Sequence, residues 1–206
     1  MIGVREGFDA GIGQASSVLL SDGLSQFVHL TIGGTTDQPI ETSSALYANL
    51  VASLAANGDP HLPVRVAPAQ IALIVLAASV HIGPAYQWTG VSAAVRAALL
   101  SAYGYQARSL GQSVVLSDIV ATIQAVPGVD YAIVTGLAVT TLSDPDTTVT
   151  ALGNLATRLS AQPPSSIPVP LAAAVPGPPP QAINPAEIAI LSPDVPDSLV
   201  LTQITP

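Results

Sequence analysis

The sequence predicts an α+β protein in which helices pack on one face of a mixed β-sheet, followed by a proline-rich extended strap and short C-terminal strands. Two observations predict this class. Segments with the two-residue period of a strand and segments with the helical period follow one another in the order strand, helix, strands, helix, short helix, strand. Beyond about Thr141 the composition turns polar and then proline-rich, which indicates that the folded core ends there.

The N-terminal part is predicted to hold two strands separated by a turn. Among the first 26 residues the run SSVLL is interpreted as a lone strand. The dipeptide Asp22-Gly23 indicates a turn. The stretch FVHLTIGG alternates and is β-branched, which predicts a strand from Phe27 to Ile32 with His29 and Thr31 on one face.

The stretch ETSSALYANLVASLAANGDP predicts a helix with both ends marked. Thr42 or Ser43 is expected to cap the free N–H groups of the first turn. Asn57-Gly58 is expected to end the helix in the left-handed conformation. Apolar residues recur at three- and four-residue steps and form one stripe, which consists of Leu46, Leu50, Val51 and Leu54.

The most apolar stretch, VRVAPAQIALIVLAASVHI, favours strand because it is rich in Val, Ile and Leu. It predicts a long buried strand, or two strands joined by a bend. Its run from Ile71 to Val80 is about half the ~20 residues that a membrane helix needs. A second helix is predicted from Trp88 to Tyr103, with Val91, Val95 and Leu99 on one side and Gly104 at its end.

The block from Gly111 to Tyr131 compresses three elements. A brief extended piece precedes a short helix, for which Ser117 is the expected N-cap and Asp118 a first-turn acid favoured by the helix dipole. Pro127-Gly128 ends the helix, whose apolar stripe includes Ile123. The next stretch, VDYAIVTGLAV, is apolar on both faces, which predicts a strand that is central or covered on both sides.

The chain is expected to divide into four segments. The proline-rich run from Pro163 to Pro180 favours extended polyproline geometry and is too poor in apolar residues to order itself, so we expect a neighbouring subunit to hold it. The segments are an N-terminal strand and turn at 1–26, an α+β core at 27–141, a polar and then proline-rich strap at 142–182, and a C-terminal strand segment at 183–206.

The composition excludes several function classes. Charged residues make up 9% of the chain, whereas roughly 25% is usual for globular domains. Partner subunits are therefore expected to cover much of the surface. The net charge of −8 and the absence of lysine argue against binding to nucleic acid or to an anionic membrane. Because cysteine is absent, disulfides and a cysteine nucleophile are excluded.

The search for catalytic motifs predicts no catalytic residue, no cofactor and no metal site. His29, His61 and His81 are isolated and lack metal-ligand spacing. The sequence GLSQF around Ser25 lacks the second glycine of a nucleophile elbow. Asp144 and Asp146 offer too few oxygens for Ca²⁺ and are interpreted as a solvated turn. Trp88 and the nearby Tyr86 suit packing better than sugar stacking.

Several motifs together resemble the baseplate J-like family of putative baseplate assembly proteins. The signature region is RSLGQSVVLSDIVATIQAVPGVDYAIVTGL, from Arg108 to Leu137. Upstream lie VHLTIGG, SALYANLVASLAANGDPHLPVRV and WTGVSAAVRAALLSAYGY, and AEIAILSPDVPDSLVL lies near the end. The resemblance covers residues 27–140 and 183–201. Family members are usually longer, so the chain is similar to their C-terminal portion or to a shortened member.

The resemblance implies a structural wedge subunit of a contractile phage tail or a related contractile injection system, with no catalytic residue to carry over. Implied partners are a second J-like wedge protein, the gp25-like sheath-initiation protein and the central hub and spike, in a particle with six-fold symmetry. The implied location is the bacterial cytoplasm during assembly and then the particle. The first residues, MIGVREGFDAGIG, have no apolar run, so no secretory signal is expected.

Two other functions are weighed against this one: an accessory carbohydrate-binding or adhesive module, and a small hydrolase. The first predicts an exposed aromatic platform, and the second predicts a histidine beside a Ser or Asp in a pocket. The block from Gly111 is interpreted mainly as packing, with an interface role for part of its surface. The candidate structural and interface residues are Gly111, Gln112, Ser117, Ile123, Pro127, Gly128 and Trp88.

Overall fold

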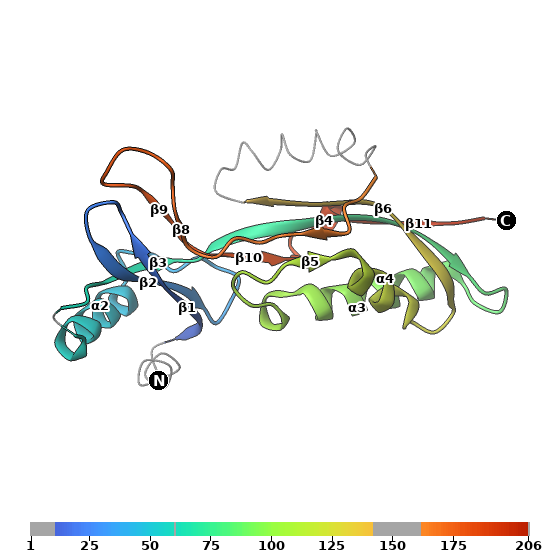
Figure 1. Ribbon diagram of the computed structural model, residues 1–206. Coiled ribbons are helices and arrows are strands. Elements are labelled where there is room, and N and C mark those ends of the chain that lie inside the picture. Colours follow the sequence, from blue (N-terminus) through green and yellow to red (C-terminus); the bar gives the residue numbers. More distant parts are fainter. Residues whose placement is uncertain (1–10, 60, 142–161, 206) are drawn as a thin grey trace. The chain divides into compact units, whose positions relative to one another are not determined.

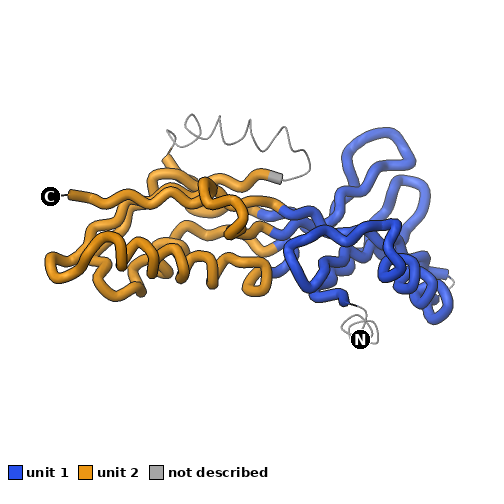
Figure 2. Tube along the Cα trace, turned by 180° about the vertical axis from the view of Figure 1, so that it is seen from behind, with its two compact units in different colours: residues 1–71, 109–111, 169–188 blue, residues 72–108, 112–168, 189–206 orange. Residues whose placement is uncertain are grey.

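A computed structural model describes residues 11–59, 61–141 and 162–205. Its elements form two compact units, coloured in Figure 2. Unit 1 contains residues 1–71, 109–111 and 169–188, and unit 2 contains residues 72–108, 112–168 and 189–206. Each unit combines stretches that are far apart in the sequence, so the units differ from the four consecutive segments expected from composition. Those segments stay a prediction about domain organisation. The α+β class is confirmed, since helices and mixed sheets occur together (Figure 1).

Unit 1 is built on a three-stranded sheet in the order β1-β2-β3. The strands are β1 (Ile12–Ser21), β2 (Gln26–Gly34) and β3 (Val64–Pro68). The first is longer than the predicted lone strand, and it pairs antiparallel with β2. Strand β3 pairs parallel to β2 because α2 (Ala45–Asn57) provides the crossover between them.

Helix α2 differs from its prediction at both ends. Its N-cap is Ser44, whose Oγ accepts from the Tyr47 N–H, and not Thr42 or Ser43. Gly58 is the C-cap but has a φ of −81°, so the expected left-handed stop is wrong. None of its residues is buried, and the side chain of Val51 is 39% exposed. The apolar stripe therefore forms but is only partly covered by the described residues.

Unit 2 is built around β4 (Gln70–Ile82). Ala69 separates this strand from β3, which precedes it in the sequence. Strand β6 (Val129–Thr141) pairs antiparallel to β4, and β11 (Leu199–Gln203) pairs parallel to it, so the sheet is mixed. Strand β10 (Glu187–Ile190) also pairs with β4. Among the described strands β6 pairs with β4 alone, and Tyr131 and Ile133 on it are 43% and 53% exposed. The expected central position of this strand is therefore wrong.

Helices α3 (Trp88–Tyr103) and α4 (Leu116–Gln124) lie on the same side of this sheet (Figure 1). The predicted bounds of α3 are confirmed, and its stripe of Val91, Val95 and Leu99 is buried. Helix α4 begins one residue before Ser117, and its N-cap is Val115. Ser117 is instead exposed and donates to the Asp118 carboxylate at 3.3 Å, so its predicted cap role is wrong.

The proline-rich strap pairs with its own chain, which corrects the expectation that only a neighbour can hold it. In unit 2, β7 (Ser166–Ile167) pairs with β5 (Val114–Val115). In unit 1, β8 (Ala173–Ala174) pairs with β9 (Ile183–Asn184), and β8 also contacts β1. Hydrogen bonds to the backbone hold a proline-rich strap without a hydrophobic core of its own. The remaining short elements are two 3₁₀-helices, η1 (Tyr105–Ala107) and η2 (Pro196–Ser198).

Replacing the two predicted residues of α4 tests how this helix faces the sheet. Ile123 is fully buried, so Ile123→Asp places an unpaired charge in the core and is expected to cost several kcal/mol of unfolding free energy. Ser117→Ala removes an exposed hydroxyl that caps nothing, so its expected cost is below ~0.5 kcal/mol. Urea unfolding of both variants measures the difference, and equal costs would contradict the assigned face.

Candidate functional site

The predicted signature region begins with a buried arginine, Arg108. Arg108 is 5% exposed, and its Nε donates to the carbonyl of Ala189 at 3.1 Å. Its Nη2 donates to the carbonyls of Gln112 and Ser113, which closes the turn between η1 and β5. Burial lowers the pKa of Arg108 from its ordinary value, and the ring of Tyr103 lies 5.6 Å from its guanidinium carbon. The arginine thus ties β10 to this turn within unit 2.

Gly111 allows two segments of unit 1 to approach closely. Its φ is +72°, and its N–H donates to the Glu187 carbonyl at 2.8 Å. A Cβ at this position would lie 2.3 Å from Cδ2 of Leu171, which is far inside van der Waals contact. The residue is therefore required by backbone conformation and by packing. Burial also raises the pKa of the neighbouring Glu187 carboxyl.

The other predicted interface residues fall in different environments of unit 2. Gln112 is exposed and accepts from Arg108, and Pro127 is exposed in the turn after α4. Gly128 has a φ of +94°, and a Cβ there would lie 2.5 Å from the ring of Tyr86. Trp88 is half-buried and lines a hollow of about 300 Å³ together with Ser92, Arg96 and Leu201. The structure does not gather these residues into one site, and their interface role stays a prediction.

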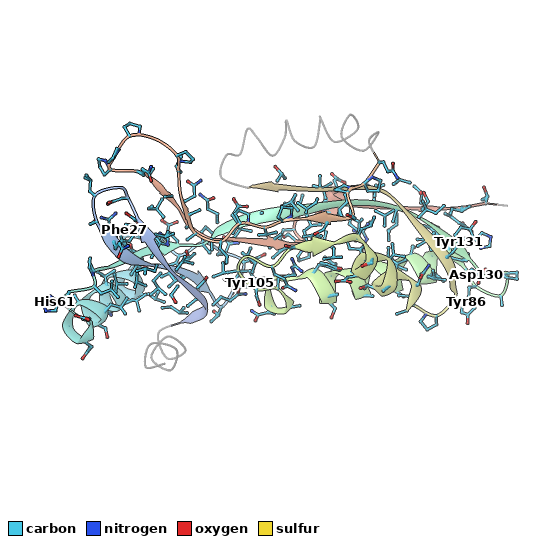
Figure 3. The ribbon with its side chains drawn as sticks, in the orientation of Figure 1. Phe27, His61, Tyr86, Tyr105, Asp130 and Tyr131 are labelled. Atoms are coloured by element: carbon cyan, nitrogen blue, oxygen red, sulfur yellow. The ribbon has the colours of Figure 1, made fainter. Side chains whose placement is uncertain are left out.

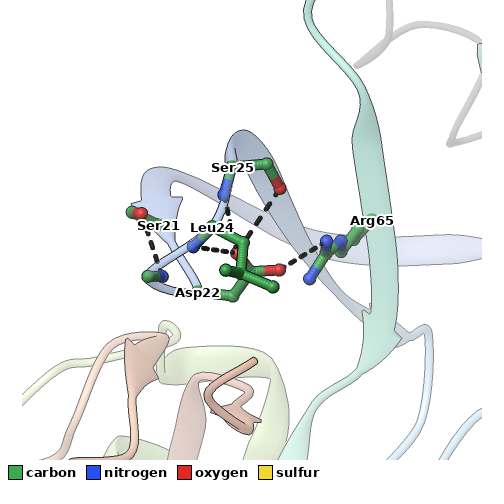
Figure 4. Close-up of polar contacts among 6 residues, drawn as sticks. Ser21, Asp22, Leu24, Ser25 and Arg65 are labelled. Carbon is green, nitrogen blue, oxygen red and sulfur yellow. Dashed lines mark hydrogen bonds and ion pairs between the residues drawn. The ribbon is translucent and has the colours of Figure 1, made fainter. Parts of the chain in front are cut away.

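A polar cluster that the sequence analysis missed organises the turn between β1 and β2. Asp22 is 3% exposed, and one carboxylate oxygen accepts from the N–H groups of Leu24 and Ser25 at 3.0 and 2.9 Å (Figure 4). The other accepts from Arg65 at 2.7 Å. The Arg65 guanidinium also lies 3.8 Å from the centre of the Phe27 ring. The serine three residues after Asp22 was the available signal, because an aspartate bonds the N–H groups that follow it in such turns.

These bonds keep Asp22 charged. The Ser25 N–H, the Arg65 guanidinium and the Leu24 N–H, in that order, hold the pKa of Asp22 well below its ordinary value. The Asp22 carbonyl accepts from the Gln181 N–H at 2.8 Å, so the same residue also binds the strap. The cluster therefore connects three sequence-distant segments of unit 1.

His29 and Thr31 share one face of β2, as the alternation predicts, and both side chains are buried. His29 and Thr31 are 4% and 0% exposed. The Thr31 hydroxyl lies 3.4 Å from His29 Nδ1 and accepts from the Ala186 N–H at 3.1 Å. Burial, and then the charge of Arg65, lower the pKa of His29. A neutral His29 that accepts from Thr31 satisfies this arrangement, so the histidine is a structural residue.

An exposed aromatic cluster lies where β4 and β6 pair in unit 2. Tyr86, Asp130 and Tyr131 lie close together there (Figure 3). The rings of His81 and Tyr131 stack with 4.8 Å between centroids, and His81 Nδ1 lies 3.1 Å from Asp130 Oδ2. Tyr86 is 50% exposed and rests on Gly128. His81 makes no hydrogen bond to a serine or threonine among the described residues, so no hydrolytic triad is assembled there.

The described residues offer little for other chemistry. No group of three His, Cys, Asp or Glu side chains among them is placed to hold a metal ion. His61 is exposed, with its own N–H donating to Asp59. Asp144 and Asp146, the predicted solvated turn, lie outside the described residues. No described helix has the length and apolar character needed to cross a membrane.

Comparison with known families identifies the larger part of unit 1. A family model described as the Baseplate J-like central domain matches residues 9–67. The resemblance to the baseplate J-like family is confirmed. The match begins upstream of the motifs that carry the resemblance and ends before the signature region from Arg108 to Leu137. It corresponds to the family's central domain rather than to the C-terminal portion expected. No curated protein sequence matches the chain.

The Asp22 cluster lies within this baseplate J-like segment (residues 9–67) and makes its stability dependent on pH. The pKa of Asp22 is lower in the folded chain than the ordinary 3.8, so the unfolded chain binds more protons below about pH 4. Stability is therefore complete above that pH and falls as the pH drops further. In Asp22→Asn this acid dependence should be weaker, whereas the exposed-site control Asp194→Asn should keep it. Urea midpoints between about pH 2 and pH 6 measure the effect, and equal slopes in both variants would contradict it.

Substitution at Gly111 tests the close approach of Leu171. Gly111→Ala is expected to cost about 1–3 kcal/mol, because alanine is strained at positive φ and its Cβ meets the leucine side chain. Gly177→Ala is the matched control, since no atom lies within 4 Å of a Cβ there and its φ is not positive. Thermal unfolding of the two variants gives the comparison. Equal stability would show that the turn at Gly111 adjusts without cost.

Proposed function

We propose that this protein is a structural wedge component of the baseplate of a contractile phage tail or contractile injection system. It joins neighbouring wedge subunits and links the baseplate to the sheath. The observation that carries the proposal is the match of residues 9–67 to the Baseplate J-like central domain. The role is structural, without catalysis.

The distribution of charge supports a protein that works through contacts with other subunits. The described arginines, Arg65, Arg96 and Arg108, all bind groups of the same chain. Arg96 donates to the Leu199 carbonyl at 2.8 Å rather than to an acid. The Arg65 side chain is 46% exposed, so the described surface keeps some positive charge, but charged residues make up only 9% of the chain. A surface this poor in charge is typical of proteins that partner subunits cover.

The mechanical role follows from this kind of surface. A wedge component holds its neighbours in one arrangement until a trigger shifts them and releases the sheath, which requires interfaces with two discrete packings. The proposed partners are a second J-like wedge protein, the sheath-initiation protein and the hub and spike. The proposed location of the protein is the bacterial cytoplasm during assembly and the finished particle afterwards.

A second candidate is an adhesive or carbohydrate-binding accessory module of such a particle. The observation that favours it is the pair of exposed tyrosines, Tyr86 and Tyr131, close to Asp130. Its support is weaker than that for the wedge role, because the Tyr131 ring already stacks on His81 and Tyr86 rests on Gly128. Both rings thus contribute to packing within the chain.

Deleting the protein from a strain that produces the particles tests the wedge role. Complete sheathed particles are expected to be lost while the other components are still expressed, because sheath assembly requires a finished baseplate. Electron microscopy and quantification of the remaining components provide the measurements. Substituting His29, His61 and His81 with Gln is the control for catalysis and should leave assembly and contraction intact in variants that fold. Contraction-competent particles made without the protein would refute the proposal.

A further inference from the structure

An apolar groove runs beside the last strand of the three-stranded sheet in unit 1. Its volume is about 320 Å³. One wall is the second half of α2, and the other is β3 with the loop before it. Val51 in α2 and Leu62 in the loop are 39% and 37% exposed, so the lining is apolar and open. The principal lining residues are Val51, Leu54, Asp59, Leu62, Val64 and Val66.

The outer edge of β3 has unpaired backbone groups along this groove. Val28 donates to the Pro63 carbonyl and Ala69 donates to the Ile32 carbonyl, which fixes the parallel ladder. In such a ladder alternate residues point their N–H and C=O groups toward the neighbouring strand. The backbone groups of Val64 and Val66 therefore point away from β2, and no described strand pairs with them. Among these groups, only the Val66 carbonyl has a hydrogen-bond partner in the described part of the chain, the Tyr47 hydroxyl at 2.7 Å.

The groove carries one charge, which is negative. Asp59 lines it, and one of its oxygens accepts from the His61 N–H at 2.8 Å. Its other oxygen has no hydrogen-bond partner among the described residues. Arg65 is on β3 itself, but it does not line the groove and its guanidinium is bound to Asp22. A ligand of the groove must therefore supply its own positive charge to complement Asp59.

We propose that an extended, apolar segment of a partner protein, carrying a lysine or arginine, adds to β3 as a fourth strand and fills this groove. The Val64 N–H and carbonyl and the Val66 N–H supply the backbone hydrogen bonds, since the Val66 carbonyl is bound by Tyr47. The groove takes alternate side chains of the added strand, and Asp59 pairs with its cation. The identification of the partner as another baseplate subunit rests on the proposed function. The strand addition itself rests on the groove, the edge of β3 and Asp59. A second copy of this chain is disfavoured as the occupant, since the net charge is −8 and the described arginines are engaged.

Amide exchange on the full chain tests this strand addition with defined probes. The probe is a synthetic peptide of alternating Val and Thr with one lysine near its end, and matched peptides carry glutamate in place of lysine or a central proline. The lysine peptide is expected to slow exchange at the Val64 and Val66 amides about tenfold. It should bind about fivefold more tightly than the glutamate peptide. The proline peptide should not bind, because it cannot continue the ladder.

Variants of the groove distinguish strand addition from nonspecific binding of the peptide. Val51→Lys and Leu62→Lys each place a positive charge at an exposed position of the lining, so both should fold. Both should weaken binding of the lysine peptide more than about tenfold, because they reduce the apolar area and repel its cation. Leu24→Lys is the control, since Leu24 is 72% exposed in the β1–β2 turn outside the groove, and it should bind the peptide normally.

Three results would overturn the inference. The first is unchanged exchange at both amides with millimolar peptide. The second is protection of these amides in the dilute chain without peptide, which would show that the chain covers its own edge. The third is protection that rises with protein concentration, which would identify a second copy as the occupant. All three are independent of the deletion experiment, because they use the isolated chain.

Discussion

The fold of unit 2 depends on burying both faces of β4. Its residues from Ala72 to Ala78 are all buried, although a strand alternates its side chains between two faces. Strand β6 pairs along one edge and β11 along the other, so the backbone of β4 is satisfied by its neighbours. Leu73 and Val75 form a small cluster with Ala138 and Val195. A strand this apolar requires cover on each face of the sheet. Helices α3 and α4 lie on the same side (Figure 1), so they cover only one of the two faces.

Arginine side chains supply much of the remaining organisation in both units. Arg96 binds the carbonyls of Pro196 and Leu199, which fixes the approach to β11. Arg108 binds the Ala189 carbonyl in β10 and the turn before β5. Both bonds join segments separated by eighty or more residues. Because a guanidinium offers several donors in a fixed plane, one side chain can satisfy several carbonyls at once. This use of cations for internal bonds leaves few of them on the surface.

The same use of charge bears on the proposed function, which depends on contacts with other subunits. The candidate surfaces are uncharged or acidic: the exposed tyrosines and Ile133 on unit 2, and the groove beside β3 on unit 1. Among the described residues no group of three His, Cys, Asp or Glu side chains is placed to hold a metal ion, and the His81–Asp130 pair is occupied by stacking and ion pairing. Apolar area and open strand edges favour recognition by partners of matching shape, as the proposed wedge role requires.

The sequence by itself determined the elements that have strong periodicity and sharp ends. The bounds of α3 and the buried position of Ile123 in α4 follow from spacing and from flanking Gly and Pro. The sequence left open whether the apolar stretch forms one long strand or the two strands β3 and β4. The α+β class and the family resemblance were also available from it. These features are local, so neighbouring residues contain the information that specifies them.

Only the tertiary structure decided which surfaces are covered and which polar groups meet. Strand β6 is as apolar as a central strand, yet its position at an edge depends on strands encoded elsewhere in the chain. The strap is held by β5 and by its own hairpin, pairings that composition cannot reveal. The bonds of Asp22 to Arg65 and of Arg108 to Ala189 join residues 43 and 81 positions apart. Local patterns specify periodicity but not pairing, because partners far apart in sequence meet only when the whole chain folds.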